Sequence, residues 1–197
     1  METHHRFFVY SEHHLCIDEI NNINFIPYTL GAQYCRQHCK TGGVAILVTN
    51  NIQFNIIDLG QFSKEKDLEV CALRISLLQK NLIIACIYRS PTGAFQYFIK
   101  QLEVILNRIY KAQTYIILCG DFNINHLVES NRYNQLQSLL ASYNLISTVT
   151  FPTRITSNIS IIIDNIYVNV DCCNYKVFPF INGLSDNNAQ IMEILNI

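Results

Sequence analysis

Short runs of β-branched and aromatic residues recur along the chain, and they constrain its fold more than any other feature. They occupy residues 7–10, 43–49, 70–76, 82–88, 115–119 and 161–168. Val, Ile, Phe and Tyr dominate these runs, as strands prefer. Over residues 95–109 and 133–143, apolar side chains instead recur every three or four positions, which predicts two amphipathic helices. Without repeats or a linker, this order predicts one α/β-type domain over residues 1–197.

Polar side chains stand where several of the predicted strands end. Glu12 follows the first run, Tyr88 and Arg89 close the run at 82–88, and Asp121 and Asn123 follow the run at 115–119. Strand ends that a sheet brings together are common places for binding sites. Carboxylate and amide oxygens suit a hard cation such as Mg²⁺, which keeps several waters and leaves room for a substrate phosphate.

Further acids extend this pattern toward the C-terminus. Asp186 and Asn187 lie in a polar loop before strand-like residues 191–195. Asp164 interrupts the apolar run at 161–168, where a carboxylate without a partner is costly to bury. Taken alone, each residue also fits a plain structural role: Asp121 in a turn, for example, or Glu12 as a solvated acid. The residues by themselves leave a metal site and a set of ordinary turns both open.

Composition narrows the class of protein. Half of the 197 residues are hydrophobic, 15% are charged and the net charge is -1, which is typical of a globular domain. No overall basic excess indicates nucleic acid. Five basic residues could line a groove: Arg36, Lys40, Arg89, Arg132 and Arg154. For any single one of them, a scattered solvated charge is the favoured interpretation.

The positions of the cysteines and the absence of long apolar stretches indicate the cellular compartment of the protein. Cys71, Cys86 and Cys119 lie in predicted strands, where a free thiol behaves as a small hydrophobe. No secretory signal or membrane-spanning run is visible. We therefore expect an intracellular protein, nuclear or cytoplasmic, that is not secreted and has no membrane partner. Zinc is disfavoured because Cys35 and Cys39 have no second ligand pair at the usual spacing.

Seven short motifs give the chain a family resemblance. In order they are SEHHL, GGVAILV, IYRSP, GDFNIN, FPTRIT, IDNIYVN and GLSD. Together they resemble the endonuclease/exonuclease/phosphatase superfamily, and within it the endonuclease domain of non-LTR retrotransposon proteins. The resemblance runs from about residue 8 to the C-terminus.

The resemblance implies a fold and an activity. The fold would be an α-β-β-α sandwich of four layers, DNase I-like, with two mixed β-sheets flanked by helices. The activity would be hydrolysis of a phosphodiester with Mg²⁺ or Mn²⁺, with DNA as partner and no small-molecule cofactor. The roles it implies are metal binding by Glu12 and Asp186, phosphate binding by Tyr88 and Asn123, water activation by Asp121, and support of the catalytic histidine by Asp164.

Two departures from the family pattern weaken the expected activity. The family's last motif is Ser-Asp-His, and this chain has Asn187 in place of the histidine. A family strand carrying a phosphate-binding Asn would lie before Met1, so we expect an N-terminally truncated copy with an exposed edge near residues 7–10. The hypotheses are a weakened Mg²⁺-dependent DNA endonuclease and, as an alternative, a catalytically dead remnant that at most binds nucleic acid or protein. A phosphatase of the same superfamily acting on lipid or nucleotide is disfavoured, because the motifs resemble retroelement proteins.

Overall fold

The structure, a computed structural model, describes residues 6–39, 41–77, 80–169, 174–181, 183 and 187–195. Its strands are β1 Phe7–Ser11, β2 Tyr28–Tyr34, β3 Val44–Thr49, β4 Asn55–Ile57, β5 Glu69–Ser76, β6 Asn81–Tyr88, β7 Thr114–Asp121, β8 Leu145–Ser147, β9 Arg154–Ile155, β10 Ser160–Ile161, β11 Asp164–Asn169, β12 Asn174–Phe180 and β13 Ala189–Leu195. Its helices are α1 Ile17–Asn22, α2 Phe95–Ile109, α3 Asn131–Ala141 and the 3₁₀ turn η1 Gly60–Phe62.

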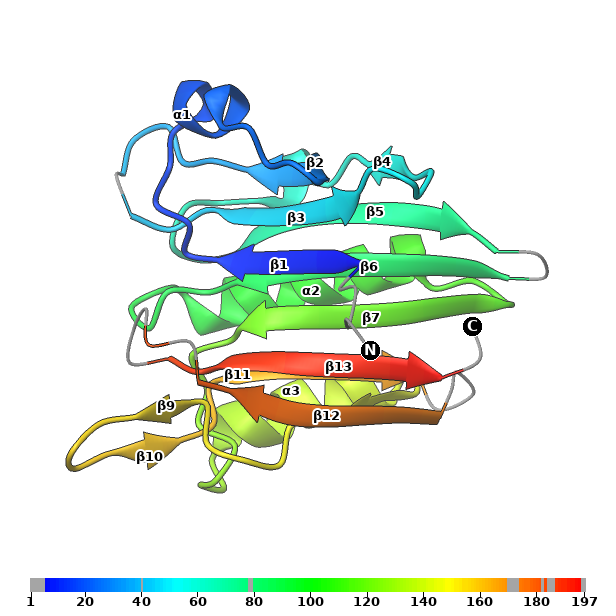
Figure 1. The fold of residues 1–197 in the computed structure, drawn as a ribbon. Helices are drawn as coiled ribbons and strands as arrows, with labels where there is room; N and C mark the ends of the chain where they lie inside the picture. The colour runs from blue at the N-terminus through cyan, green and yellow to red at the C-terminus, as the bar shows by residue number, and fades with distance from the viewer. Residues whose placement is uncertain are drawn as a thin grey trace.

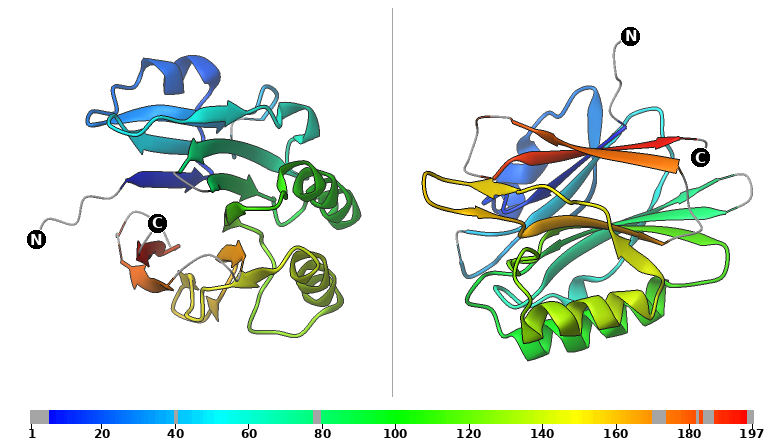
Figure 2. Two further views of the ribbon diagram at one scale, coloured as in Figure 1. Left: turned by 90° about the vertical axis from the view of Figure 1, so that its right-hand side faces the viewer. Right: turned by 90° about the horizontal axis from the view of Figure 1, so that it is seen from below.

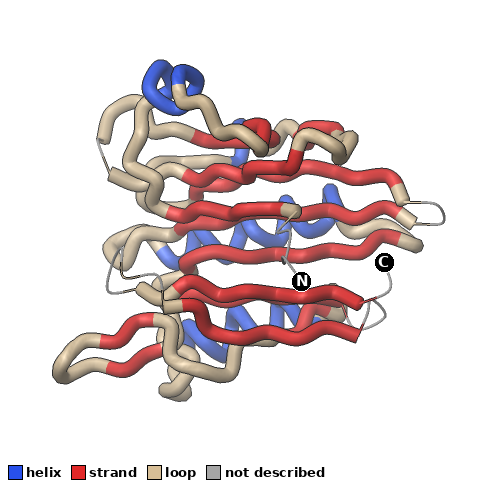
Figure 3. Tube along the Cα trace, viewed as in Figure 1, coloured by secondary structure: helices blue, strands red, loops and turns tan. Residues whose placement is uncertain are grey.

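Two β-layers face each other, with helices outside. A six-stranded mixed sheet has the order β4-β5-β6-β7-β11-β8, and only its β6–β7 pair is parallel. An antiparallel sheet of order β1-β3-β2 and the hairpin β12–β13 lie across from it (Figures 1 and 2). Helices α2 and α3 cover the outer face of the six-stranded sheet, while α1 lies next to β2 (Figure 3). The predicted sandwich class is confirmed.

One core lies between the helices and the six-stranded sheet. The inward positions of α2 are buried at the predicted three- and four-residue spacing: Phe98, Leu102, Ile105, Leu106 and Ile109. Burying an apolar side chain of this size contributes about 1.5–3 kcal/mol. Helix α3 begins after Ser130, whose hydroxyl caps it by accepting from Tyr133 N at 3.1 Å. Both helices predicted from periodicity are confirmed, and α2 has the predicted bounds.

A second core fills the space between the two β-layers. Val44, Ile46 and Val48 of β3 pack here against the inner face of the six-stranded sheet. Side chains of the β12–β13 hairpin cover part of the same core, among them Val177 and Met192. The functional residues described below lie at one end of this inter-sheet space.

Some predicted elements differ from the structure. The predicted strand at residues 161–168 divides into β10 and β11, with Asp164 as the first residue of β11 and not inside a strand. Strand β2 was not predicted; its register shifts between Leu30 and Ala32, where Gly31 packs against β3. Strand β12 was not predicted either, since Pro179 disfavours a strand interior.

The predicted exposed edge is present among the described residues. There, β1 pairs with β3 alone, and Tyr10 of β1 is 46% exposed. The hairpin β12–β13 lies beside β1 in the same layer without joining its sheet (Figures 1 and 2). Free edges invite pairing with other chains. We therefore expect self-association that grows with concentration, measurable by sedimentation velocity; a monomer at every concentration would contradict this.

The described cysteines are free thiols, and Cys71, Cys86 and Cys119 are buried strand residues as predicted. No helix in the described part of the chain is long and apolar enough to cross a membrane.

His126 lies on the helix-covered side of the six-stranded sheet. Its Nδ1 is 3.1 Å from Asn165 Nδ2, and its Nε2 is 3.0 Å from Tyr167 Oη. Tyr167 packs in the core beneath the helices, so this ring lies on the face opposite Asp164. Because Asn165 Nδ2 can only donate, a protonated ring would bring two donors together. The environment therefore favours neutral imidazole.

This environment predicts a pH dependence of stability. Burial lowers the pKa of His126 to about 4 from its ordinary 6.5. The unfolded chain then binds this proton more strongly, so stability is lost as pH falls from 6.5 toward 4. We expect urea unfolding at several pH values to show this loss and a His126→Gln variant to lack that part of it. A His126 resonance that titrates near 6.5 would contradict the assignment.

Candidate active site

Four polar side chains stand in one row across the six-stranded sheet. Glu69 of β5 pairs with Tyr88 of β6, Tyr88 with Asp121 of β7, and Asp121 with Asp164 of β11. Directly paired residues point to the same face of a sheet. Tyr88 belongs to the core between the two β-layers, which identifies that face. Strand pairing therefore places three carboxylates and a phenol side by side at one end of the inter-sheet space.

Glu12 reaches this row from the opposite sheet. It is the first residue after β1, and its Oε1 accepts a hydrogen bond of 2.5 Å from Tyr88 Oη. Glu12 has a φ of 58° and sits on a loop beside Gly43, whose carbonyl oxygen accepts from Glu12 N at 2.8 Å. The site thus joins both β-layers.

Asn123 fixes the carboxylate of Asp121. Asn123 N donates to Asp121 Oδ1 at 2.8 Å, and Asn123 Nδ2 donates to Oδ2 at 3.0 Å. Arg89 supports both residues: Arg89 N donates to Asp121 O, and Arg89 Nη2 donates to Asn123 O at 2.7 Å. The Arg89 side chain is fully buried and also donates to the carbonyl of Phe122. Asp121 is therefore held in one orientation.

Thr153 connects Asp164 with the segment that carries Asn187. Thr153 Oγ1 accepts from Asp164 N at 3.2 Å, and Thr153 O accepts from Asn188 N at 2.7 Å. Asn187 itself forms a β-bridge with Arg154. Asp164 Oδ2 is buried without a hydrogen-bond partner among the described residues, so one carboxylate oxygen at the site is left to a further group.

Burial and electrostatic repulsion raise the pKa values of Asp121 and Asp164. Desolvation raises the pKa of Asp121 well above its ordinary value, and the charge of Asp164 raises it further. Desolvation also raises the pKa of Asp164, with Glu12 adding to the effect. The pKa of Tyr88 is raised by burial and by its hydrogen bond to Glu12, so the phenol stays protonated and donates.

These residues fit a divalent cation. Glu12, Asp121 and Asp164 repel one another, and a cation bound at Glu12 would offset part of this repulsion. Among the described residues, no group of three or more His, Cys, Asp or Glu side chains is arranged to hold a metal ion. Mg²⁺ takes only one or two protein carboxylates and keeps several waters, so Glu12 and one further acid would be enough to bind it.

The sequence predictions for this site can be placed residue by residue. The structure brings together Glu12, Tyr88, Asp121, Asn123 and Asp164. Asn187 lies next to this group, where it forms a β-bridge with Arg154, and Asp186 lies outside the described residues.

Two residues at the site, Glu69 and Thr153, were not predicted to take part, and Arg89 was placed at the end of its strand without a supporting role. Glu69 was missed because it directly precedes the predicted strand at 70–76. The reading of single basic residues as solvated charges is wrong for Arg36 and Arg89, which are both buried. The sequence did contain a signal for the role of Arg89, because this charged residue directly follows an apolar run and the functional Tyr88.

Comparison with solved structures defines the class of fold. The endonuclease domain of the telomere-specific non-LTR retrotransposon TRAS1 matches with a TM-score of 0.68 and 17% identity, covering 86% of this chain and 81% of that one. The AP endonuclease of Leishmania major matches with a TM-score of 0.72 and 12% identity, covering 97% and 79%. The Neisseria 3′ phosphatase NExo, bound to product DNA hairpin, matches with a TM-score of 0.66 and 16% identity, covering 98% and 90%. The chain therefore has the endonuclease/exonuclease/phosphatase fold.

The sequence assigns it more narrowly. Residues 82–188 match the endonuclease-reverse transcriptase family, and the chain belongs to that family. This stretch includes Tyr88, Asp121, Asn123 and Asp164. No curated protein matches the chain.

Proposed function

We propose that the chain is a Mg²⁺-dependent phosphodiesterase domain that cuts DNA, with weakened activity. The observation that carries this proposal is the row of Tyr88, Asp121 and Asp164, joined by Glu12 from the opposite sheet. Ordinary turn residues would not converge from four separate strands onto one face. Membership of an endonuclease-reverse transcriptase family supports the reaction class.

Asp121 is the residue best placed to accept a proton from an attacking water. Burial raises its pKa, and a carboxylate is a more effective base as its pKa approaches the working pH. Asn123 occupies one side of both carboxylate oxygens, so the remaining lone pairs are directed into the site. Tyr88 keeps its proton and can donate to a phosphate oxygen once Glu12 has another partner.

Glu12 is the proposed metal ligand, together with Asp186 by family resemblance. Mg²⁺ would polarise the phosphoryl oxygens and offset developing negative charge. Asp164 lies beside Asp121 with one carboxylate oxygen that no described residue satisfies. In the resemblance Asp164 orients the catalytic histidine. Here Asp164 would orient Asn187, which stands in place of that histidine.

DNA is the proposed substrate. Two solved structures with this fold are described as DNA complexes: NExo with a product DNA hairpin and zebrafish (D. rerio) TDP2 with a single-strand DNA product. These matches are 16% and 13% identical to this chain, so they support the choice of substrate only through the shared fold.

The alternative is a remnant that binds nucleic acid or protein without cutting. Asn187 favours it, because an amide can donate a hydrogen bond but cannot carry a charge or transfer a proton. The two hypotheses differ in a single measurable property, which is metal-dependent turnover.

We expect slow Mg²⁺-dependent nicking of supercoiled plasmid by the unmodified chain, and partial rescue by Asn187→His. Losing a phosphate-contacting group of this kind typically lowers the rate by about 10²- to 10⁴-fold, and Asn187→His would restore the imidazole at that position. Gel analysis of relaxed plasmid over time, with Mg²⁺ or with EDTA, measures both rates.

Asn188→His is the matched control, since it adds an imidazole one position along the same segment. No nicking by either the unmodified chain or Asn187→His would favour the binding remnant. Rapid nicking by the unmodified chain, equal to that of Asn187→His, would show that the asparagine costs nothing.

A further inference from the structure

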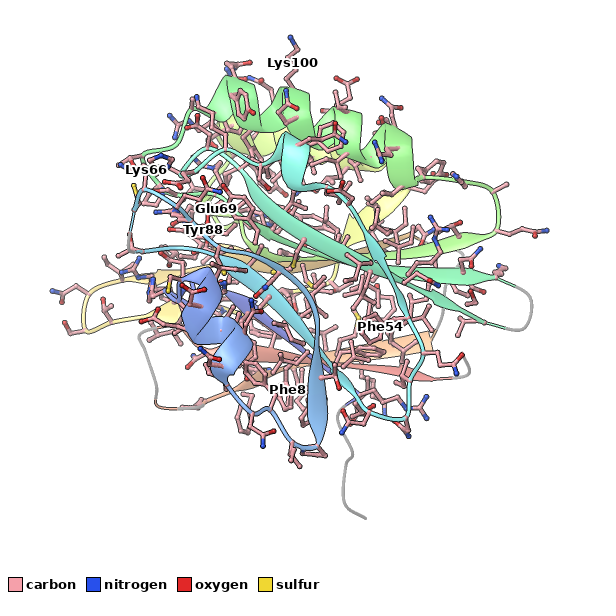
Figure 4. The ribbon with its side chains drawn as sticks, turned by 90° about the horizontal axis from the view of Figure 1, so that it is seen from above. Phe8, Phe54, Lys66, Glu69, Tyr88 and Lys100 are labelled. Carbon is pink, nitrogen blue, oxygen red and sulfur yellow. The ribbon has the colours of Figure 1, made fainter. Side chains whose placement is uncertain are left out.

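A buried carboxylate outside the proposed catalytic set holds the loop on which Glu12 depends. Glu69 is fully buried at the start of β5, beside Tyr88 (Figure 4). Its Oε1 accepts from Arg36 Nε at 2.6 Å and from Lys66 N at 3.0 Å. Its Oε2 accepts from Gly43 N at 2.7 Å. Glu69 thus ties two loops and a buried guanidinium together.

The contact to Gly43 continues to Glu12. Gly43 O accepts from Glu12 N at 2.8 Å, and Gly42 O accepts from His14 N at 2.8 Å. Glu12 and His14 have φ values of 58° and 61°, a region that non-glycine residues enter at an energetic cost. The loop at residues 42–43 therefore imposes a backbone conformation that the segment carrying Glu12 would otherwise leave.

The same ion pair reaches the other partner of the Glu12 hydrogen bond. Arg36 Nη2 lies 2.5 Å from Glu69 Oε1, and both side chains are buried. The Arg36 guanidinium lies 5.5 Å from the centre of the Tyr88 ring, within range of a cation–π interaction. Glu69 thus contacts Gly43, which supports Glu12, and its partner Arg36 contacts the Tyr88 ring directly.

We infer that Glu69, paired with Arg36, is a positioning residue that holds the Glu12 carboxylate against Tyr88 and in place for a divalent cation. It acts through Gly43 and touches neither metal nor substrate. The cation part of this inference rests on the proposed function, whereas the placement of Glu12 does not. Partners of metal ligands commonly matter in this way, and their loss weakens metal affinity by about 10- to 100-fold.

The first test measures Mn²⁺ affinity by titration with an EPR readout of free Mn²⁺. Glu69→Gln is expected to weaken binding by about 10-fold or more. The matched control is Glu65→Gln: Glu65 accepts from Gln37 N at 2.6 Å and His38 N at 2.9 Å, but contacts neither Gly43 nor Arg36 in the described hydrogen bonds. The control should bind Mn²⁺ as the unmodified chain does. Equal affinity in Glu69→Gln and the unmodified chain would overturn the inference.

The second test reads the Glu12–Tyr88 contact without metal. In protein labelled with 3-fluorotyrosine, the ¹⁹F resonance of Tyr88 is assigned by its loss in Tyr88→Phe. In the otherwise unmodified chain, Glu69→Gln should move the Tyr88 resonance toward the position that it has in Glu12→Ala. In a chain that already carries Glu12→Ala, adding Glu69→Gln should move the resonance little further. Equal shifts in both backgrounds would mean that Glu69 acts on Tyr88 directly, and would refute positioning through Glu12.

Folding is controlled by removing both charges. Glu69→Gln alone leaves Arg36 buried without its partner, which destabilises proteins strongly, and adding Arg36→Gln removes this unpaired charge. Arg36→Gln combined with Glu69→Gln should stay folded and still bind Mn²⁺ weakly. A chain that binds no Mn²⁺ before any substitution would count against the proposed function, while the Tyr88 resonance would still decide the role of Glu69.

Discussion

Asp121→Asn is expected to lower the rate of Mg²⁺-dependent plasmid nicking by about 10³-fold, because it removes the only proposed proton acceptor. The amide has nearly the shape of the carboxylate but no charge and little basicity. Asp121 is buried and held by Asn123 at both oxygens, so water cannot easily replace it. The rate is best measured in the Asn187→His background, where a larger starting rate leaves room for the loss.

Asp18→Asn serves as the control for Asp121→Asn, because Asp18 is exposed on the first turn of α1. The control should nick at the rate of its parent. If Asp121→Asn retains activity within about tenfold of its parent, proton transfer to Asp121 does not limit the reaction, and the role assigned to it is wrong.

Gly120→Ala is expected to destabilise the fold by more than about 3 kcal/mol, combining backbone strain with a steric clash. Gly120 has a φ of 137°, and a Cβ there would lie 1.9 Å from Ile87 O. Since β6 and β7 pair through these residues, relief of the clash requires the central strands to separate. Urea unfolding followed by circular dichroism measures the loss.

Gly183→Ala separates the two contributions. Gly183 also has a positive φ, of 67°, but a Cβ there would meet no described atom within 4 Å. This control should cost only about 1 kcal/mol, the strain of a left-handed residue. Similar losses for the two variants would show that β7 can move away from Ile87 at little cost.

The fold could be predicted wherever one side of an element is buried. Helix α2 and strands β3, β5 and β6 have long apolar patterns that match their burial, so their periodicity is informative. The short strands β4, β8, β9 and β10 carry two or three residues each, too few for a period to show. Strands β4 and β8 pair with strands farther along the chain, whereas β9 and β10 pair with each other across a short loop.

The candidate site was predictable where polar residues follow an apolar strand. Asp121 and Asn123 were found this way. Glu69 and Thr153 were not, because a Glu before a strand and a Thr in a loop resemble ordinary surface residues. Their burial distinguishes them from surface residues. This burial depends on contacts with Arg36 and Asp164, which come from other parts of the chain.

The row formed by Glu69, Tyr88, Asp121 and Asp164 has a consequence for how the chain acquires its site. Each member comes from a different strand, and the last joins only when β11 pairs with β7. Closing such long loops is slow and entropically costly, and it is rewarded only when the sheet is complete. A nascent or proteolysed chain that ends before β11 would carry the GDFN sequence and the β5–β6–β7 pairing but lack Asp164 beside it. The site is therefore among the last features of the domain to form. Cleavage of the chain between β7 and β11 would separate Asp164 from the other three members of the row.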